Sequence, residues 1–206
     1  MAEENFFEIA YSIKDTDEAR AMYDRWAKVY DRDLTDGEYQ QPKRCADTLS
    51  SVLADKQASV LDVGCGTGLS GLALQQAGYT KVDGCDLSEG MLEKAAELNL
   101  YNRLFACDLN HPPIDAEDGA YDAVTAVGVF SFGHISADAV DELLRVVVAD
   151  GIIIIGLNDH FYEEGSLVSK LEALSSQGVI EILSREHGEH IPANDLKGWV
   201  LTLKKI

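Results

Sequence analysis

The sequence predicts an α/β fold with a doubly wound sheet of seven strands. The first observation is a short apolar strand at 59–63 that leads into glycines at alternate positions, Gly64, Gly66 and Gly68, and then into a helix. Strand, glycine turn and helix together form the first unit of a nucleotide-binding sheet. The second is the alternation of apolar strands with helical patterns as far as residue 155, and the third is a pair of consecutive strands at the end.

Two helices are expected before the sheet. Asp15 can cap the first, with Glu18 three residues later to complete a capping box. Its apolar residues recur at helical spacing as far as Tyr30. The second helix is expected over 41–54, with Pro42 in its first turn. We expect residues 1–206 to form one domain, in which 1–56 are N-terminal lid helices and 57–206 a Rossmann-like core.

The remaining elements follow from apolar runs and their boundary residues. A helix from 69 to 77 is expected to end at Gly78, and Ser88 and Ser136 are expected to cap two later helices. A further helix around Leu167–Leu174 should end before Gly178, and the strand at 152–155 is apolar on both faces, as in the centre of a parallel sheet. The other strands are expected at 81–86, 103–109, 121–129, 179–185 and 199–205, the last two joined by a polar loop.

The charge and the apolar content of the sequence argue against two kinds of partner, nucleic acids and membranes. Seventeen basic residues face 36 acidic ones, for a formal net charge of −19. Such a surface repels phosphate backbones, so no nucleic-acid partner is expected. No apolar run is long enough to span a bilayer, and the acidic start of the chain lacks the basic region of a signal peptide. We therefore expect a cytoplasmic protein with no membrane partner, whose oligomeric state is open.

The cysteines and histidines predict no metal site. The four cysteines, Cys45, Cys65, Cys85 and Cys107, form no C-x-x-C pair. Three of them fall near the ends of the first three strands of the sheet, where we expect small buried side chains. Apart from the pair His187 and His190 in the last loop, the five histidines show no ligand spacing with an acid or a cysteine, so we expect that no metal is required.

The glycine loop by itself allows two cofactors. Gly66-Thr67-Gly68-Leu69-Ser70-Gly71 fits the dinucleotide pattern G-x-G-x-x-G. However, Asp62 lies two residues before the first glycine, and Asp86 ends the next strand and is followed by Leu87-Ser88-Glu89-Gly90-Met91. This combination resembles the class I S-adenosylmethionine (SAM) dependent methyltransferases. The resemblance also implies that the last strand of the sheet is antiparallel.

The resemblance assigns roles to individual residues. The glycine loop wraps the methionine and ribose of SAM, Asp86 binds the ribose hydroxyls, the residues after it flank the adenine, and Asp108 binds the adenine amino group. The segment Tyr23–Asp31 resembles a lid whose aromatic residues close over the cofactor, although its spacing alone also fits a plain amphipathic helix. The expected cofactor-binding residues are Trp26, Tyr30, Asp62, Gly64, Cys65, Gly66, Thr67, Gly68, Asp86, Leu87, Met91, Asp108, Leu109, Val127 and Gly128.

The predicted function is methyl transfer from SAM to a small-molecule acceptor, with S-adenosylhomocysteine (SAH) as product. Over nearly the whole chain the sequence resembles the methyltransferase-like proteins named after the Williams–Beuren syndrome chromosome region, a family that does not fix the acceptor. Phe130–His134 should line the acceptor pocket. His134 is the candidate base or orienting residue, or else the cap of the next helix; Asn158 and His160 are the fallback. An NAD-dependent oxidoreductase and a non-catalytic SAM-binding regulator stay open as alternatives.

Overall fold

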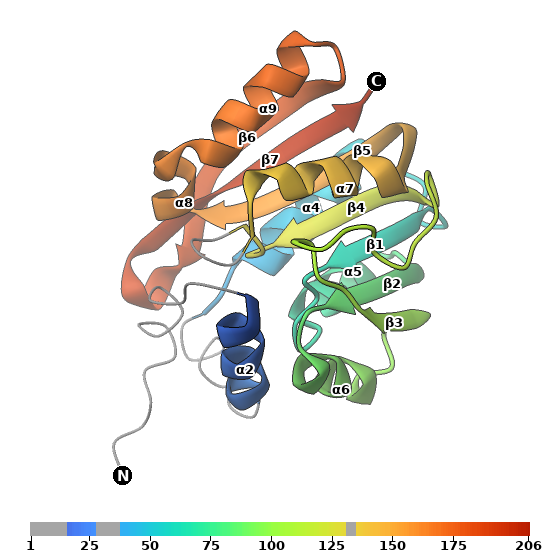
Figure 1. Ribbon diagram of the computed structural model, residues 1–206, viewed down its shortest axis with the longest axis vertical. Coiled ribbons are helices and arrows are strands. Elements are labelled where there is room, and N and C mark those ends of the chain that lie inside the picture. The colour runs from blue at the N-terminus through green and yellow to red at the C-terminus, as the bar shows by residue number, and fades with distance from the viewer. Residues whose placement is uncertain (1–15, 28–37, 131–134) are drawn as a thin grey trace.

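The computed structural model describes residues 16–27, 38–130 and 135–206, and they form an α/β fold around a seven-stranded sheet (Figure 1). The strand order is β3-β2-β1-β4-β5-β7-β6, and β7 runs antiparallel to both of its neighbours. This arrangement confirms the predicted seven-stranded sheet with an antiparallel last strand. The strands are β1 Ser59–Val63, β2 Lys81–Asp86, β3 Arg103–Ala106, β4 Tyr121–Val127, β5 Val147–Asn158, β6 Ile180–Ile191 and β7 Leu196–Lys205.

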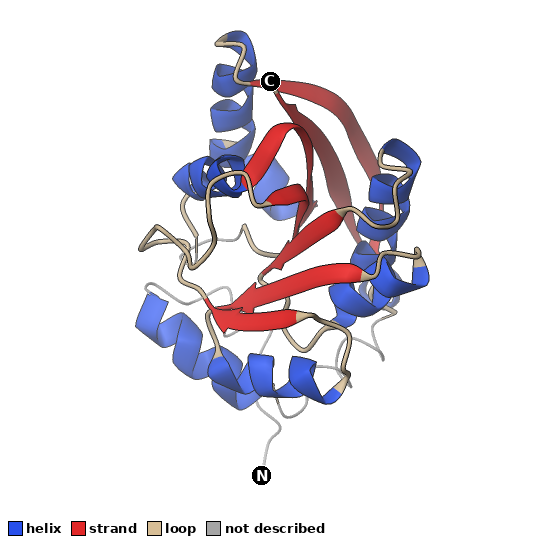
Figure 2. Cartoon of the chain, turned by 90° about the vertical axis from the view of Figure 1, so that its right-hand side faces the viewer, coloured by secondary structure: helices blue, strands red, loops and turns tan. Residues whose placement is uncertain are grey.

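Helices cover both faces of this sheet (Figure 2). One face carries α4 and α5, and the other carries α7 and α9, while α6 lies along β2 and β3 at one end of the sheet (Figure 1). The α-helices are α2 Thr16–Trp26, α4 Gln41–Val52, α5 Leu69–Gln76, α6 Glu89–Glu97, α7 Val140–Val146, α8 Asp159–Glu164 and α9 Ser166–Ser176; η1 Ala137–Ala139 and η2 Pro192–Asn194 are short 3-10 turns.

The run of isoleucines in β5 builds the core on both sides of the sheet. Because successive side chains of a strand point to opposite faces, Ile153 and Ile155 pack with the α7 and α9 side, and Ile152 and Ile154 with the α4 and α5 side. Burying each of these side chains stabilises the fold by roughly 1.5–3 kcal/mol. The apolar run therefore places β5 in the interior, as its sequence predicts.

Several element boundaries differ from the sequence prediction. β3 ends at Ala106 and β4 at Val127, so the residues that follow them form loops at the site instead of continuing the strands. β5 begins at Val147, before the expected turn, and accommodates Asp150 with a left-handed φ of 62°. The expected polar loop of 186–198 is mostly strand, because β6 is an edge strand whose polar side chains face solvent. Helix α8 was not expected.

The strand order places a switch point between β1 and β4. From β1 the chain winds outward to β2 and β3, and it then returns to β4 and continues in the opposite direction. In open α/β sheets ligands bind beyond the carboxyl ends of the strands at such a point. Helix α2 lies at that end of the sheet, beside α6 (Figure 1). None of the helices in the described part of the chain has the length and apolarity that a bilayer span requires.

Candidate functional site

A cavity of about 100 Å³ lies beyond the carboxyl ends of β1, β2, β3 and β4. Its walls come from five segments that are distant in the sequence, which is how a doubly wound sheet assembles a ligand site. The lining residues are Ala19, Tyr23, Gly64, Gly66, Asp86, Leu87, Met91, Cys107, Asp108, Leu109, Val127, Gly128, Val129 and Ile135.

Glycines bring the first loop close to this cavity. Gly64, Gly66 and Gly68 all adopt positive φ, at 65°, 54° and 102°, a region that other residues rarely occupy. A Cβ on Gly64 would lie 2.4 Å from the side chain of Val129, whereas one on Gly66 would meet no atom within 4 Å. Gly64 therefore allows close packing against the chain after β4, and Gly66 keeps its face of the loop open to a ligand.

Asp86 ends β2 and fixes the glycine loop. Its Oδ2 accepts a hydrogen bond from Gly66 N at 2.9 Å, and its Oδ1 accepts one from Ser88 N at 2.9 Å. Burial raises the pKa of Asp86, and the two backbone N–H donors oppose that rise. The carboxylate also lines the cavity, so it retains lone pairs for a ligand donor.

Asp62 lies beneath the loop, away from the residues that line the cavity. Its Oδ2 accepts hydrogen bonds from Ser70 Oγ at 2.5 Å and Tyr101 Oη at 2.8 Å, and its Oδ1 accepts one from Thr125 Oγ1 at 2.9 Å. Complete burial raises the pKa of Asp62 to about 6 in spite of these donors. The structure therefore gives Asp62 the role of joining α5, β4 and the turn before β3 under the glycine loop.

Tyr101 also explains the third glycine of the dinucleotide-like pattern. Gly71 N donates to Tyr101 Oη at 3.1 Å, and a Cβ on Gly71 would lie 2.3 Å from that oxygen. Gly71 thus makes room for a buried phenol. The G-x-G-x-x-G match therefore reflects internal packing at its last position.

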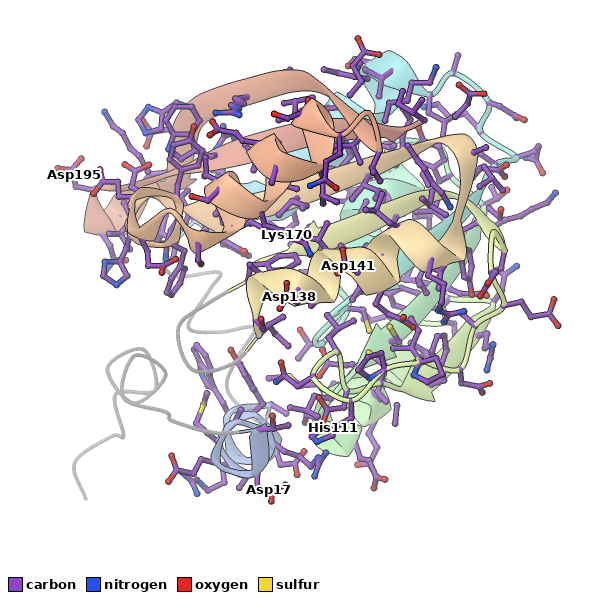
Figure 3. All side chains as sticks on the ribbon, turned by 45° about the horizontal axis from the view of Figure 1, so that its top comes forward. Asp17, His111, Asp138, Asp141, Lys170 and Asp195 are labelled. Atoms are coloured by element: carbon purple, nitrogen blue, oxygen red, sulfur yellow. The ribbon has the colours of Figure 1, made fainter. Side chains whose placement is uncertain are left out.

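Asp108 lies at the opposite wall of the cavity from the glycine loop, with Cys107 and Leu109 beside it. Its Oδ1 accepts from Asn110 N at 2.9 Å, and its Oδ2 lies 2.8 Å from His111 Nδ1. His111 is exposed near α2 (Figure 3). Asp108 is therefore both a turn residue and a cavity carboxylate, which unites the two interpretations of its sequence position.

Helix α2 covers the cavity with Tyr23 and Ala19. Trp26 is 4% exposed and packs with Met22 and Met91 between α2 and α6, while its ring stacks on Tyr23 with centroids 6.0 Å apart. Trp26 therefore supports the covering helix from behind, and Tyr23 supplies the aromatic surface that faces the site. Tyr30 and His134, with the rest of 131–134, lie outside the described residues.

Polar contacts fasten α2 on both sides of the cavity. On the α6 side, Asp24 Oδ1 accepts from Ser88 Oγ and from Gly90 N, the latter at 3.2 Å. On the β3 side, Arg20 Nη2 lies 3.8 Å from Asp108 Oδ2, and Asn110 Nδ2 donates to Thr16 Oγ1 at 3.0 Å. A Cβ on Gly90 would lie 3.3 Å from the Cα of Asp24, so Gly90 permits this close approach.

A second, smaller hollow of about 30 Å³ lies beside the glycine loop. It is lined by Tyr39, Pro42, Gly64, Cys65, Gly66, Thr67, Leu69, Ser70 and Val127. Three of these residues, Gly64, Gly66 and Val127, also line the large cavity. The two hollows therefore lie next to each other at the glycine loop. Cys65 and Thr67 line the smaller one, and Gly68 caps the start of α5.

Sequence reasoning missed several residues that the structure brings to the site. Tyr39 stands outside any motif, and no signal in the sequence marks it. Tyr23 and Asp24 lie inside the quoted lid segment, so their presence near the site was implied there without separate roles. Asn158 and His160, the fallback residues, belong to the start of α8, where Asn158 Oδ1 accepts from Phe161 N at 3.1 Å and caps the helix.

The residues present fit the two ends of a nucleoside-containing ligand such as SAM. The large cavity offers carboxylates that accept from hydroxyl and amino groups, Asp86 and Asp108, with the apolar Leu87 and Met91 between which a flat base can lie. The small hollow presents the open face of Gly66 and the hydroxyl of Thr67. Within the described ranges, no three His, Cys, Asp or Glu side chains are arranged to hold a metal ion.

Comparison with known sequences decides the class. Residues 60–151 match the family described as methyltransferase domain, a range that contains β1, the glycine loop, Asp86 and Asp108. Residues 60–151 therefore resemble a methyltransferase domain. Methyltransferase-like protein 27 of Homo sapiens is 39% identical over 136 residues, which are 65% of this chain and 56% of that protein. The chain thus spans just over half the length of this curated relative.

Several solved structures share the fold of this chain. A TehB-like SAM-dependent methyltransferase from Corynebacterium glutamicum has a TM-score of 0.63 at 22% identity, covering 90% of this chain and 99% of that one. Magnesium protoporphyrin IX methyltransferase from Synechocystis, with bound SAH, has a TM-score of 0.65 at 18% identity, covering 89% and 94%. The [4+2]-cyclase SpnF has a TM-score of 0.71 at 19% identity, covering 94% and 97%. The fold by itself therefore does not specify the reaction.

Proposed function

We propose that the chain is a SAM-dependent methyltransferase that acts on a small-molecule acceptor and releases SAH. The observation that carries this proposal is the large cavity beside the glycine loop, which Gly66 and the carboxylates of Asp86 and Asp108 line together. The match of residues 60–151 to the methyltransferase domain family supports the same conclusion. We further propose that residues 1–206 act as one domain.

Each site residue has a part in this proposal. Asp86 accepts from the ribose hydroxyls, Leu87, Met91 and Leu109 enclose the adenine, and Asp108 accepts from the adenine amino group. Gly64, Cys65, Gly66 and Thr67 hold the methionine portion, and Gly68 shapes the turn. Asp62 keeps the loop in place through Ser70 and Thr125. Val127 and Gly128 border the reaction centre, and Trp26 supports the covering helix; Tyr30, in the same segment, is proposed to extend the cover.

Positioning accounts for the chemistry in this proposal. When bound, SAM supplies a methyl group already activated on a positively charged sulfonium. The chain must then hold the acceptor in line with that methyl group and exclude water. Tyr23 and the apolar residues Val129 and Ile135 provide a surface that excludes water beside the carboxyl end of β4. Little acid–base work is needed when the acceptor atom is already electron-rich.

The acceptor is proposed to bind at residues 130–134, after β4. Phe130 is 4% exposed and belongs to the core on the α7 and α9 face, while Val129 beside it lines the large cavity. His134 is the candidate for orienting the acceptor or taking its proton, since an unperturbed imidazole titrates near neutrality. A small, partly apolar molecule with one polar group suits these residue types. We also propose that the chain belongs among the Williams–Beuren region methyltransferase-like proteins, on the lid, glycine-loop and β2-end motifs that it shares with them.

Titration calorimetry with SAM, SAH and NAD tests the cofactor. We expect heat from SAM and SAH and none from NAD, after any co-purified cofactor has been removed. Binding of NAD without SAM would instead favour an NAD-dependent oxidoreductase, the alternative that the G-x-G-x-x-G pattern leaves open.

Isotope transfer tests the reaction. A metabolite pool incubated with methyl-labelled SAM should yield a labelled small molecule. SAM binding without any labelled product would favour the non-catalytic SAM-binding regulator, or a SAM-binding enzyme of another reaction, as the fold of the [4+2]-cyclase allows. Once an acceptor is known, His134→Ala should lower turnover and leave SAM affinity within about twofold.

A further inference from the structure

Tyr39 lies where the two hollows of the site meet. It lines the small hollow together with the glycine loop and Val127. Its hydroxyl oxygen is 3.2 Å from the position that a Cβ on Gly128 would take. Gly128 in turn lines the large cavity. The Tyr39 hydroxyl therefore lies beside Gly128, at the side of the large cavity that is next to the small hollow.

The surroundings of Tyr39 fix its ring and leave its hydroxyl available. The ring packs edge-on against His190 with centroids 5.1 Å apart, and Gln40 N donates to His190 O at 2.9 Å, so the end of β6 holds the residue in place. In the described part of the chain, the hydroxyl makes no hydrogen bond. Burial raises the pKa of Tyr39, with smaller contributions from Cys45 and Tyr23, so the phenol stays neutral at physiological pH.

The charge distribution along the space suggests what the hydroxyl meets. The carboxylates of Asp86 and Asp108 lie in the large cavity, which assigns the adenosine part of the ligand to that side. The methionine part then occupies the small hollow over Gly66 and Thr67. The sulfur connects these two parts of the ligand, and the junction of the two hollows is where Tyr39 and Gly128 face each other.

We propose that the hydroxyl oxygen of Tyr39 contacts the sulfonium of SAM and makes the site prefer SAM over SAH. The inference rests on the proposed function and adds a cofactor-contacting residue to it. A neutral phenol oxygen carries a partial negative charge, which attracts the positive sulfonium and gains nothing comparable from the neutral thioether of the product.

The test is a comparison of two dissociation constants in Tyr39→Phe, measured by titration calorimetry in one buffer. We expect SAM binding to weaken about fivefold, as for loss of one contact to a charged group, while SAH binding stays within about twofold. Tyr79→Phe is the matched control, because its hydroxyl donates to Leu53 O at 2.7 Å far from the glycine loop. It should leave the ratio of the two constants unchanged.

The possible outcomes separate this inference from the proposed function. A wild-type protein that binds no SAM would overturn both. If wild type binds SAM and the ratio of the SAM and SAH dissociation constants in Tyr39→Phe equals the ratio in wild type, the role of Tyr39 alone is overturned. This holds whether neither constant changes or both change by the same factor, because the second case means that the hydroxyl binds a group that SAM and SAH share. Thermal unfolding of each variant checks that the fold is intact.

Discussion

At the scale of single residues, two buried aspartates divide the work of one site. Asp86 faces the cavity and uses both oxygens to hold backbone N–H groups, whereas Asp62 is fully buried and surrounded by hydroxyl donors. In the sequence, both lie near the carboxyl end of a predicted strand, Asp62 before the glycine loop and Asp86 at the end of the next strand. What distinguishes them is which side of the loop each carboxylate occupies, and that depends on Ser70, Tyr101 and Thr125, which come from three separate segments.

Asp86→Ala should weaken SAM binding by on the order of 2–4 kcal/mol, because two charge-assisted hydrogen bonds to the ribose are lost and water replaces part of them. Calorimetry measures the change. Asp47→Ala is the control, since this carboxylate is exposed on α4 and pairs only with Lys43. An unchanged dissociation constant in Asp86→Ala would show that this carboxylate does not bind the ribose.

Asp62 should make stability depend on pH in the opposite sense to an ordinary ion pair. Its pKa rises from 3.8 to about 6 on folding, so the folded state binds the proton more tightly than the unfolded state. The stability of wild type relative to Asp62→Asn should therefore increase as pH falls from 7 through 6 to 4. A difference of about two between the folded and unfolded pKa values of Asp62 corresponds to about 3 kcal/mol in the free energy of unfolding. Urea unfolding of both proteins across this pH range measures the difference in their free energies of unfolding. A difference that does not change with pH would contradict the prediction.

At the scale of elements, polar contacts on two sides dock α2 over the cavity. Asp24 binds Ser88 and Gly90 at the start of α6, and Arg20 reaches Asp108 after β3. Between them Tyr23 faces the site and Trp26 packs on Met91. A similar arrangement joins α9 to the η1–α7 segment, where Lys170 lies between Asp138 and Asp141 (Figure 3).

Asp24→Ala should loosen α2 by about 1–2 kcal/mol, the usual cost of removing a carboxylate that caps a helix. Trp26 reports the change, because it is buried only while α2 packs on α6. In a Trp199→Phe background Trp26 is the single tryptophan, and its emission should shift to longer wavelength in Asp24→Ala. Asp17→Ala, which removes an exposed carboxylate from the same helix, should leave the emission unchanged. Identical spectra for Asp24→Ala and its parent would contradict this docking role.

The elements also show what the sequence can and cannot predict. The apolar run of β5, the Ser88 cap and the helix ends at Gly78 and Gly178 are local signals, and the structure has each of them. The polar residues of β6 and the site position of Tyr39 depend on pairing with distant segments. His187, for example, becomes a strand residue only because Trp199 pairs with it. Strand-end carboxylates could be placed at the site because parallel strands end at the same edge.

At the scale of the whole molecule, the surplus of acidic residues creates a negative field around the site. The chain carries a formal net charge of −19, and Asp24, Asp86 and Asp108 add to it near the cavity. Such a field attracts a cationic ligand and repels a diphosphate. It therefore favours the sulfonium cofactor over NAD before any specific contact forms.

Ionic strength should accordingly separate SAM from SAH. SAM carries one positive charge more than its product, so its attraction to the acidic molecule is screened as salt is added, and that of SAH is not. Between low salt and 0.5 M NaCl we expect the dissociation constant of SAM to rise roughly threefold and that of SAH to stay within about twofold. Calorimetry at the two salt concentrations measures both. Potassium chloride in place of sodium chloride controls for a specific ion effect and should give the same ratio. Parallel changes for SAM and SAH would mean that the field of the molecule does not contribute to the selection of its cofactor.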